Sequence, residues 1–288
     1  MEGSRLHRRQ SLRELVLRQR SWLDSRLAAQ PGLNAALDRD RRHGGGLLAG
    51  ALAFRLFGAL LPLALLVAVA VGYAATVDRA APGDAGHALG IRKAVAESLA
   101  QSAKLSTGTR WVVAAFALVS LILSASSAAR AIRAAHSLAW EGGVGRYGRR
   151  VYAGLVLILA LAGFALIWGV VGRARAELGL AGLLVAVVAI VPFFAIWLGV
   201  AALLPHADAP WTALIPGAAL VAIGMQIIHL GTVLFVAGKV ERASATYGAF
   251  GAAFTVLVWL YVASRVIVAS AMLNAALWRG RAGASSAA

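Results

Sequence analysis

Three side chains that could bind an anion fall inside otherwise apolar stretches: Arg55, His229 and Arg265. The last lies in WLYVASRVIVASAMLNA, residues 259–275, which contains no other charged residue. Placing an arginine at the centre of a bilayer costs about 2.5 kcal/mol or more, so such residues usually face a protein interior or a wet cavity. Because guanidinium groups bind phosphate through paired hydrogen bonds, these three residues could form a site for an anionic lipid or solute.

The partner of Arg265 is the question that the sequence raises most sharply. The chain has twelve acidic residues, and none lies inside a confidently apolar stretch, so no acid is an obvious partner. One hypothesis is that an external anion neutralises Arg265. The alternative is that Arg265 hydrogen-bonds backbone carbonyls, Gln226 or Asn274, stacks on Tyr261, or extends to the membrane surface.

Residues for other chemistry are scarce. There is no cysteine, and the six histidines show no pair at metal-ligand spacing. The sequence contains no P-loop, no dinucleotide-binding fingerprint and no nucleophile elbow. Paired carboxylates for acid–base catalysis have no obvious place in the apolar stretches. We therefore expect a protein that is not an enzyme and that holds no metal or cofactor.

The elements that position these residues are apolar and long. Hydrophobic residues make up 60% of the chain, charged residues 14%, and the mean hydropathy is +0.76, which together indicate a polytopic membrane protein. A membrane-crossing helix needs roughly 20 apolar residues, and continuous apolar runs predict helices instead of barrel strands. We expect an all-α bundle of six transmembrane helices, at about 47–76, 111–129, 151–172, 179–204, 211–238 and 249–278.

The segment before the first span is polar and basic. In SLRELVLRQRSWLDSRL, residues 11–27, apolar side chains fall on one helical stripe and arginines on the other side. Ser11 and Glu14 have capping-box spacing, and Pro31 followed by Gly32 ends the pattern. We predict that residues 1–46 form a cytoplasmic amphipathic arm, which either lies in the headgroups of an anionic membrane or packs on the bundle. No nucleic-acid-binding module is recognisable.

Basic residues predict the orientation. They cluster before residue 47, between residues 130 and 150, and in the tail at 279–288. If both termini are cytoplasmic, far more of the 28 lysines and arginines lie inside than outside, as the positive-inside rule requires. Trp111, Trp211 and Trp278 then fall at the ends of spans. The net charge of +16 thus indicates orientation and contact with anionic lipids, without nucleic acid as a partner.

Two stretches carry a family resemblance. SATYGAFGAAFTVLVWLYVASRVIVASAMLNAAL, residues 244–277, resembles the C-terminal signature of the YihY/virulence factor BrkB family of bacterial inner-membrane proteins. LAGALAFRLFGALLPLALLV, residues 48–67, is similar to the first span of that family. The signature residues carried over are Pro62, Tyr247, Gly248, Phe250, Trp259, Tyr261 and Asn274.

The resemblance implies six spans in the bacterial cytoplasmic membrane and a role in the cell envelope. It suggests transport or movement of an anionic lipid or solute, with membrane lipids as partners; the alternative is a membrane scaffold for envelope integrity. The family was once labelled a ribonuclease, but such an enzyme needs clustered metal ligands, which are lacking in this sequence. Two positions depart from the family pattern, because Met272 replaces a glutamate and Arg265 an aliphatic residue.

Overall fold

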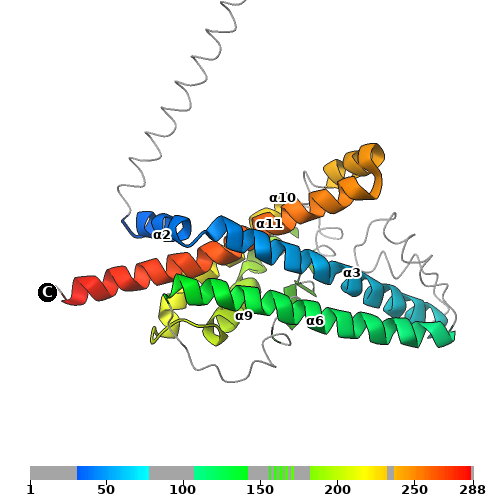
Figure 1. Ribbon diagram of the computed structural model, residues 1–288, viewed down its shortest axis with the longest axis horizontal. Helices are drawn as coiled ribbons and strands as arrows, with labels where there is room; N and C mark the ends of the chain where they lie inside the picture. Colours follow the sequence, from blue (N-terminus) through cyan, green and yellow to red (C-terminus); the bar gives the residue numbers. More distant parts are fainter. Residues whose placement is uncertain are drawn as a thin grey trace, which may run out of the picture.

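The computed structural model describes residues 31–77, 107–141, 182–231 and 237–286, with isolated positions between 156 and 171 (Figure 1). Every element of this part is helical, which confirms the all-α prediction. The elements are α2 (Pro31–Arg42), α3 (Gly45–Val77), α6 (Thr107–Ala139), α8 (Gly182–Val188), α9 (Ile190–Leu203), the 3-10 helix η2 (Trp211–Leu214), α10 (Ile215–Gly231) and α11 (Ala237–Ser286). The amphipathic stretch predicted at residues 11–27 lies outside the described residues.

Four helical segments of the described part are long and apolar enough to cross a membrane. They are Gly45–Val67, Trp111–Ala139, Trp211–Gly231 and Ala253–Ala282, and they make the chain a multi-pass membrane protein. Of the other two predicted spans, 151–172 lies largely outside the described residues, and 179–204 is divided between α8 and α9. The count of six and the orientation therefore stay predictions.

The division of the span at 179–204 has a local cause. Proline has no backbone N–H, so Pro192 cannot donate to the carbonyl of Val188, and the helix is interrupted at Ala189. The amide of Ala189 still donates to the carbonyl of Val185 at 2.9 Å, so the interruption is confined to this turn.

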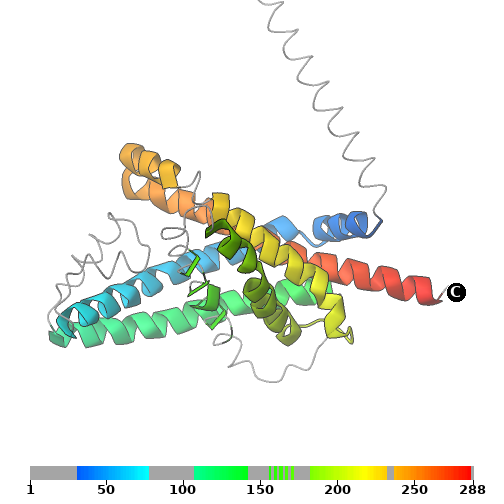
Figure 2. The ribbon, with the colours of Figure 1, turned by 180° about the vertical axis from the view of Figure 1, so that it is seen from behind.

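Helices α3 and α6 form a long antiparallel hairpin, and α11 runs past both (Figures 1 and 2). Along its length α11 contacts α10, α3, α6 and α2. The short helix α2 lies beside the C-terminal half of α11, near the start of α3. Segments that are distant in the sequence therefore meet at one end of the bundle, which we call the α2 end.

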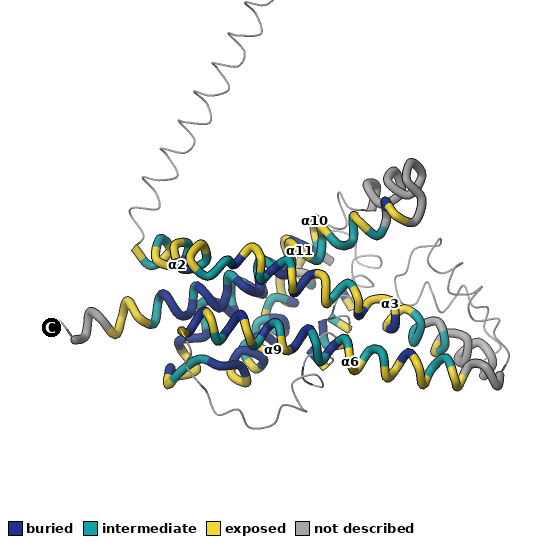
Figure 3. Tube along the Cα trace, viewed as in Figure 1, coloured by how far each residue is buried: buried dark blue, intermediate teal, exposed yellow. Residues whose placement is uncertain are grey.

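Burial differs between the two ends of the bundle (Figure 3). At the α2 end, Val268, Met272, Ala49 and Ala135 are almost completely buried in one apolar cluster with Leu214. Toward the other end of the α3–α6 hairpin, large apolar side chains are exposed, including Leu61, Phe116, Val119 and Leu123. Continuous exposed apolar surface of this kind is typical of helices that face lipid.

Helices α10 and α11 approach closely because α10 carries glycines on one face. Gly217, Gly224 and Gly231 are spaced seven residues apart and therefore lie on the same side of the helix. A Cβ atom on Gly217 would lie 2.6 Å from the carbonyl oxygen of Ser270, and one on Gly224 would lie 2.7 Å from Cγ1 of Val266. Small residues at such contacts are how membrane helices pack tightly.

Candidate functional site

A proline and a glycine set the two ends of helix α2. Pro31 occupies the first helical position, which tolerates the missing N–H. The helix ends at Arg42, and Gly44 adopts a left-handed conformation (φ 63°), which lets the chain turn into α3. Because the helix has no long apolar stripe, it was not predicted from the sequence. It carries Arg39 and Asp40 to the side of α11.

Asp40 is the partner of Arg265. The two carboxylate oxygens accept hydrogen bonds from Nη1 and Nη2 of Arg265, both at 2.9 Å. The Asp40 side chain is 14% exposed and that of Arg265 is 33% exposed, so the pair is partly shielded from solvent. The expectation that no acid pairs with Arg265 was wrong, because α2 folds back onto α11 and brings an acid from the polar segment.

The position of Arg265 along α11 also removes the need to place it at the bilayer centre. Helix α11 has 50 residues, far more than a crossing requires. Arg265 lies inside the membrane-length segment Ala253–Ala282, level with Gly45, where the span of α3 begins: a Cβ atom on Gly45 would lie 3.0 Å from Nη1 of Arg265. The polar helix α2 packs beside α11 at the same level. It can therefore sit at the membrane boundary with its acid partner.

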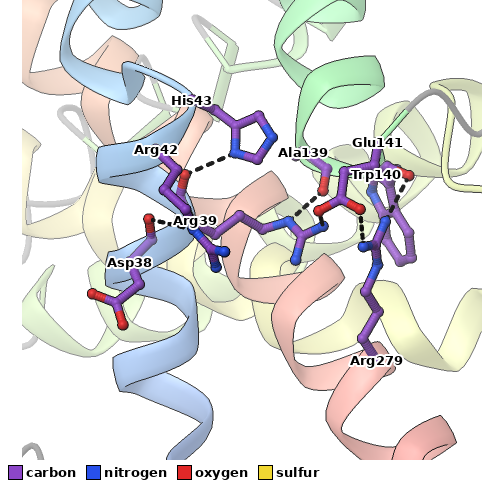
Figure 4. A network of polar contacts seen from close by, with 8 residues as sticks. All are labelled: Asp38, Arg39, Arg42, His43, Ala139, Trp140, Glu141 and Arg279. Carbon is purple, nitrogen blue, oxygen red and sulfur yellow. Dashed lines mark hydrogen bonds and ion pairs between the residues drawn. The ribbon is translucent and has the colours of Figure 1, made fainter.

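A second ionic cluster joins α2, α6 and α11, and we call Arg39, Glu141 and Arg279 the arginine clasp (Figure 4). Arg39 donates through Nε to the carbonyl of Ala139 at 2.6 Å and forms an ion pair with Glu141 through Nη2. Arg279 pairs with the other carboxylate oxygen of Glu141 and donates to the carbonyl of Trp140 at 3.1 Å. The two arginines of the clasp thus bind both Glu141 and the carbonyl groups that α6 leaves without partners at its C-terminal end.

Glu141 adopts a left-handed backbone conformation (φ 53°) just after α6. This conformation costs a non-glycine residue about 1–2 kcal/mol, and the two arginine contacts offset that cost. The hydrogen bond from Arg279 lowers the pKa of Glu141 below its ordinary value. Burial, followed by repulsion from Arg279, lowers the pKa of Arg39. Two cations share one carboxylate, so the helix carbonyls supply the remaining stabilisation.

A third group of arginines lacks acidic partners, and we call Arg55, Arg130 and Arg133 the arginine seam. Arg55 of α3 donates through Nη1 to the carbonyl of Ser127 on α6 at 3.2 Å. Arg130 is exposed on the next turn of α6, and Arg133 is half-buried one turn further on. Within the described part of the chain, none of the three forms an ion pair.

Every ion pair of the described residues uses an arginine outside the seam. Asp38 lies 4.0 Å from Arg41, Asp40 pairs with Arg265, and Glu141 belongs to the clasp. The seam therefore carries positive charge that the described residues do not neutralise. Sequence reasoning selected Arg55 for an anion site but used Arg130 and Arg133 only to predict orientation. The packing of α3 on α6 brings Arg55 to the turn that precedes Arg130.

The three predicted anion-site residues lie on three helices. Arg55 belongs to the seam, Arg265 is paired with Asp40, and His229 is half-buried on α10. Gln226 and Asn274, the alternative partners considered for Arg265, do not serve it: the Nε2 atom of Gln226 is buried without a partner, and Asn274 binds elsewhere.

Among the signature residues, Asn274 has the clearest role. Its side-chain oxygen accepts a hydrogen bond from the amide of Gly217 at 2.7 Å, and its nitrogen donates to the carbonyl of Leu214 at 3.3 Å. Both groups lie where η2 passes into α10, so Asn274 caps the start of α10 from the neighbouring helix.

Most of the other signature residues whose side chains are described pack against neighbouring helices. Pro62 is buried inside α3, Tyr261 lies beside Gly46 and Gly50, Trp259 lies next to Gly231, and Phe250 is 77% exposed. Tyr247 and Gly248 fall within α11, but their side chains lie outside the described part. Met272, which stands where the family pattern has a glutamate, is buried in the apolar cluster of the α2 end.

The described residues contain no group of three His, Asp or Glu side chains that could hold a metal ion. The family model described as Virulence factor BrkB matches residues 36–288, which is most of the chain. No curated protein matches the sequence. No solved structure matches it either.

Proposed function

The chain belongs to the virulence factor BrkB family, and from this premise we propose that it binds an anionic lipid at the arginine seam and moves it within the bacterial cytoplasmic membrane. The observation that carries the proposal is the positive charge of Arg55, Arg130 and Arg133, which no described residue neutralises, beside exposed apolar surface. A lipid phosphate supplies the missing anion, and its chains cover the apolar surface. In this proposal the protein is not an enzyme.

The location of the seam supports a lipid instead of a free anion. Residues 111–129 of α6 carry no charged side chain, and Arg130 directly follows them. Residues 56–77 of α3 likewise carry none, and Arg55 directly precedes them. Either stretch is long enough to cross or nearly cross the hydrocarbon core. The seam therefore lies where the phosphates of one leaflet would be, and the predicted orientation makes it the cytoplasmic leaflet.

Reconstitution tests the proposal directly. Purified protein is placed in liposomes that contain a fluorescent lipid, either phosphatidylglycerol or phosphatidylcholine, and the movement of that lipid between leaflets is measured. We expect movement of the anionic lipid to exceed that of the neutral one, and Arg55→Gln with Arg130→Gln to remove the difference. Arg41→Gln with Arg281→Gln, which removes the same charge from exposed positions, is the matched control. Equal movement by wild type and the seam variant would contradict the proposal.

A scaffold is the second candidate, and the arginine clasp favours it. The clasp and the Asp40–Arg265 pair fix α2 to the bundle, and in this alternative the arm before Pro31 would recruit a partner protein from that fixed point. Under this alternative, seam variants complement a deletion strain under envelope stress, whereas clasp variants that detach α2 do not. The opposite pattern supports the lipid proposal.

A further inference from the structure

The seam residues form a ladder along the axis of α6. Side chains on a helix lean toward its N-terminus, so Arg130 covers the turn that contains Ser127, where Arg55 is bound. Arg133 in turn covers the position of Arg130. Residues three apart on a helix are separated by about 4.5 Å along the axis. Ser127, Arg130 and Arg133 therefore follow one another along α6, from the contact with Arg55 toward the α2 end.

An apolar stripe on the same face of α6 continues this ladder. Val112, Phe116, Val119 and Leu123 are spaced at helical intervals that lead to Arg130, and each is at least 57% exposed. The stripe lies on the side of Arg130 away from the α2 end, within the uncharged residues 111–129. A lipid with its phosphate at Arg130 would lay its chain along this stripe.

The charge of the three seam arginines and the direction in which the seam runs along α6 together indicate which class of lipid fits. One phosphodiester carries one negative charge and would leave two of the three arginines without a partner. Because α6 crosses the membrane, the ladder runs along the bilayer normal, so a second phosphate must follow the first along the length of the lipid. A diphosphate headgroup has that arrangement. The two phosphates of cardiolipin lie side by side in the membrane plane, across the ladder.

Resting on the lipid-binding function proposed above, we propose that the seam is a site for a lipid diphosphate, a long-chain isoprenoid diphosphate in chemical class. Arg55 and Arg130 bind the phosphate next to the chain, Arg133 binds the terminal phosphate, and the apolar stripe of α6 holds the chain. Arginine suits this role because its planar donor groups bind phosphate oxygens in pairs. Binding involves no covalent step.

Competition among defined probes tests this inference. The full chain in neutral detergent is mixed with farnesyl diphosphate, farnesyl monophosphate, cardiolipin or phosphatidylglycerol, and bound lipid is counted by native mass spectrometry. We expect the diphosphate to bind about tenfold more tightly than the monophosphate, since it gains one more charge-assisted contact. Arg133→Gln should reduce binding of the diphosphate to the level of the monophosphate while leaving monophosphate binding unchanged. The control variant Arg281→Gln should leave both affinities unchanged.

The outcomes separate this inference from the proposed function. Equal binding of diphosphate and monophosphate, or tightest binding of cardiolipin, overturns the diphosphate inference. If phosphatidylglycerol then binds and requires Arg55 and Arg130, the anionic-lipid function stands. If no anionic lipid binds more tightly than phosphatidylcholine, both proposals fail. A thermal unfolding midpoint equal to that of wild type without lipid ensures that each variant is folded.

Discussion

At the scale of single residues, the arginines of the described segments divide into those with an acidic partner there and those without one. Asp40 pairs with Arg265, Glu141 pairs with both Arg39 and Arg279, and both acids come from polar segments outside the apolar stretches. The contacts join residues that are 225 and 138 positions apart in the chain. No spacing rule in the sequence predicts such pairs, because they depend on the path of α2 back to α11. This is why Arg265 lacked an obvious partner at the level of sequence.

The Asp40–Arg265 pair leads to the first prediction. Arg265→Leu should lower the free energy of unfolding by about 1–2 kcal/mol, because Asp40 loses its partner while partial exposure of the pair limits the loss. The exchange of Asp40→Arg with Arg265→Asp should recover most of that stability. Thermal unfolding in detergent measures both variants. Wild-type stability of Arg265→Leu would show that the pair does not hold α2.

The clasp leads to a prediction about pH. Arg279 lowers the folded-state pKa of Glu141, so the ionised carboxylate stabilises the folded protein above the unfolded pKa of about 4.3. That contribution is lost as the pH falls through the lower folded value. Glu141→Gln should therefore be less stable than wild type between about pH 5 and pH 8, and the difference should shrink below about pH 4. Asp208→Asn, at an exposed position outside the ion pairs, is the control. A difference that does not change with pH would contradict the ionic role.

At the scale of elements, the long apolar helices were predictable and the short polar one was not. The first span was expected at 47–76 and is found within Gly45–Val77, because a continuous apolar run is a strong signal. Helix α2 has no comparable signal, since Asp, Arg and Asn make up much of it. The close packing of α10 on α11 depends on which residues of the two helices face each other, such as Gly217 with Ser270, and the apolar runs alone do not predict that pairing.

The glycines of α10 give a prediction with a matched control. Gly224→Ala places a Cβ 2.7 Å from Val266, so we expect a loss of about 1–3 kcal/mol from overpacking. Gly58→Ala on α3 meets no atom within 4 Å and should be neutral or slightly stabilising. The thermal unfolding midpoints of the two variants, each compared with wild type, test this prediction. Equal midpoints would mean that α10 and α11 do not pack as closely as described.

At the scale of the whole molecule, the ion pairs of α2 with α11 and with the end of α6 lie at the α2 end, and exposed apolar side chains lie toward the other end. The start of α3, the end of α6, the loop before η2 and the C-terminal half of α11 all meet at the α2 end. Six crossings with both termini inside require these same segments to lie on one side of the membrane. The orientation itself was predicted from basic residues and stays a prediction.

Reporter fusions test that orientation. Fusions after Arg42, Arg146 and Arg281 should report the cytoplasm, and a fusion near Gly86 should report the outside, because the basic clusters are retained inside. A cytoplasmic signal at Gly86 would reverse the expected topology. The seam would then face the outer leaflet.

The central claim is that the arginine seam binds an anionic lipid, and the lipid that remains bound during purification tests it most directly. Wild type, Arg55→Gln/Arg130→Gln/Arg133→Gln and the control Arg41→Gln/Arg42→Gln/Arg281→Gln are purified identically in neutral detergent. Bound lipid is then extracted and measured by mass spectrometry. We predict that wild type and the control retain anionic lipid, whereas the seam variant, folded to the same unfolding midpoint, loses most of it. Equal retention by all three proteins would contradict the claim.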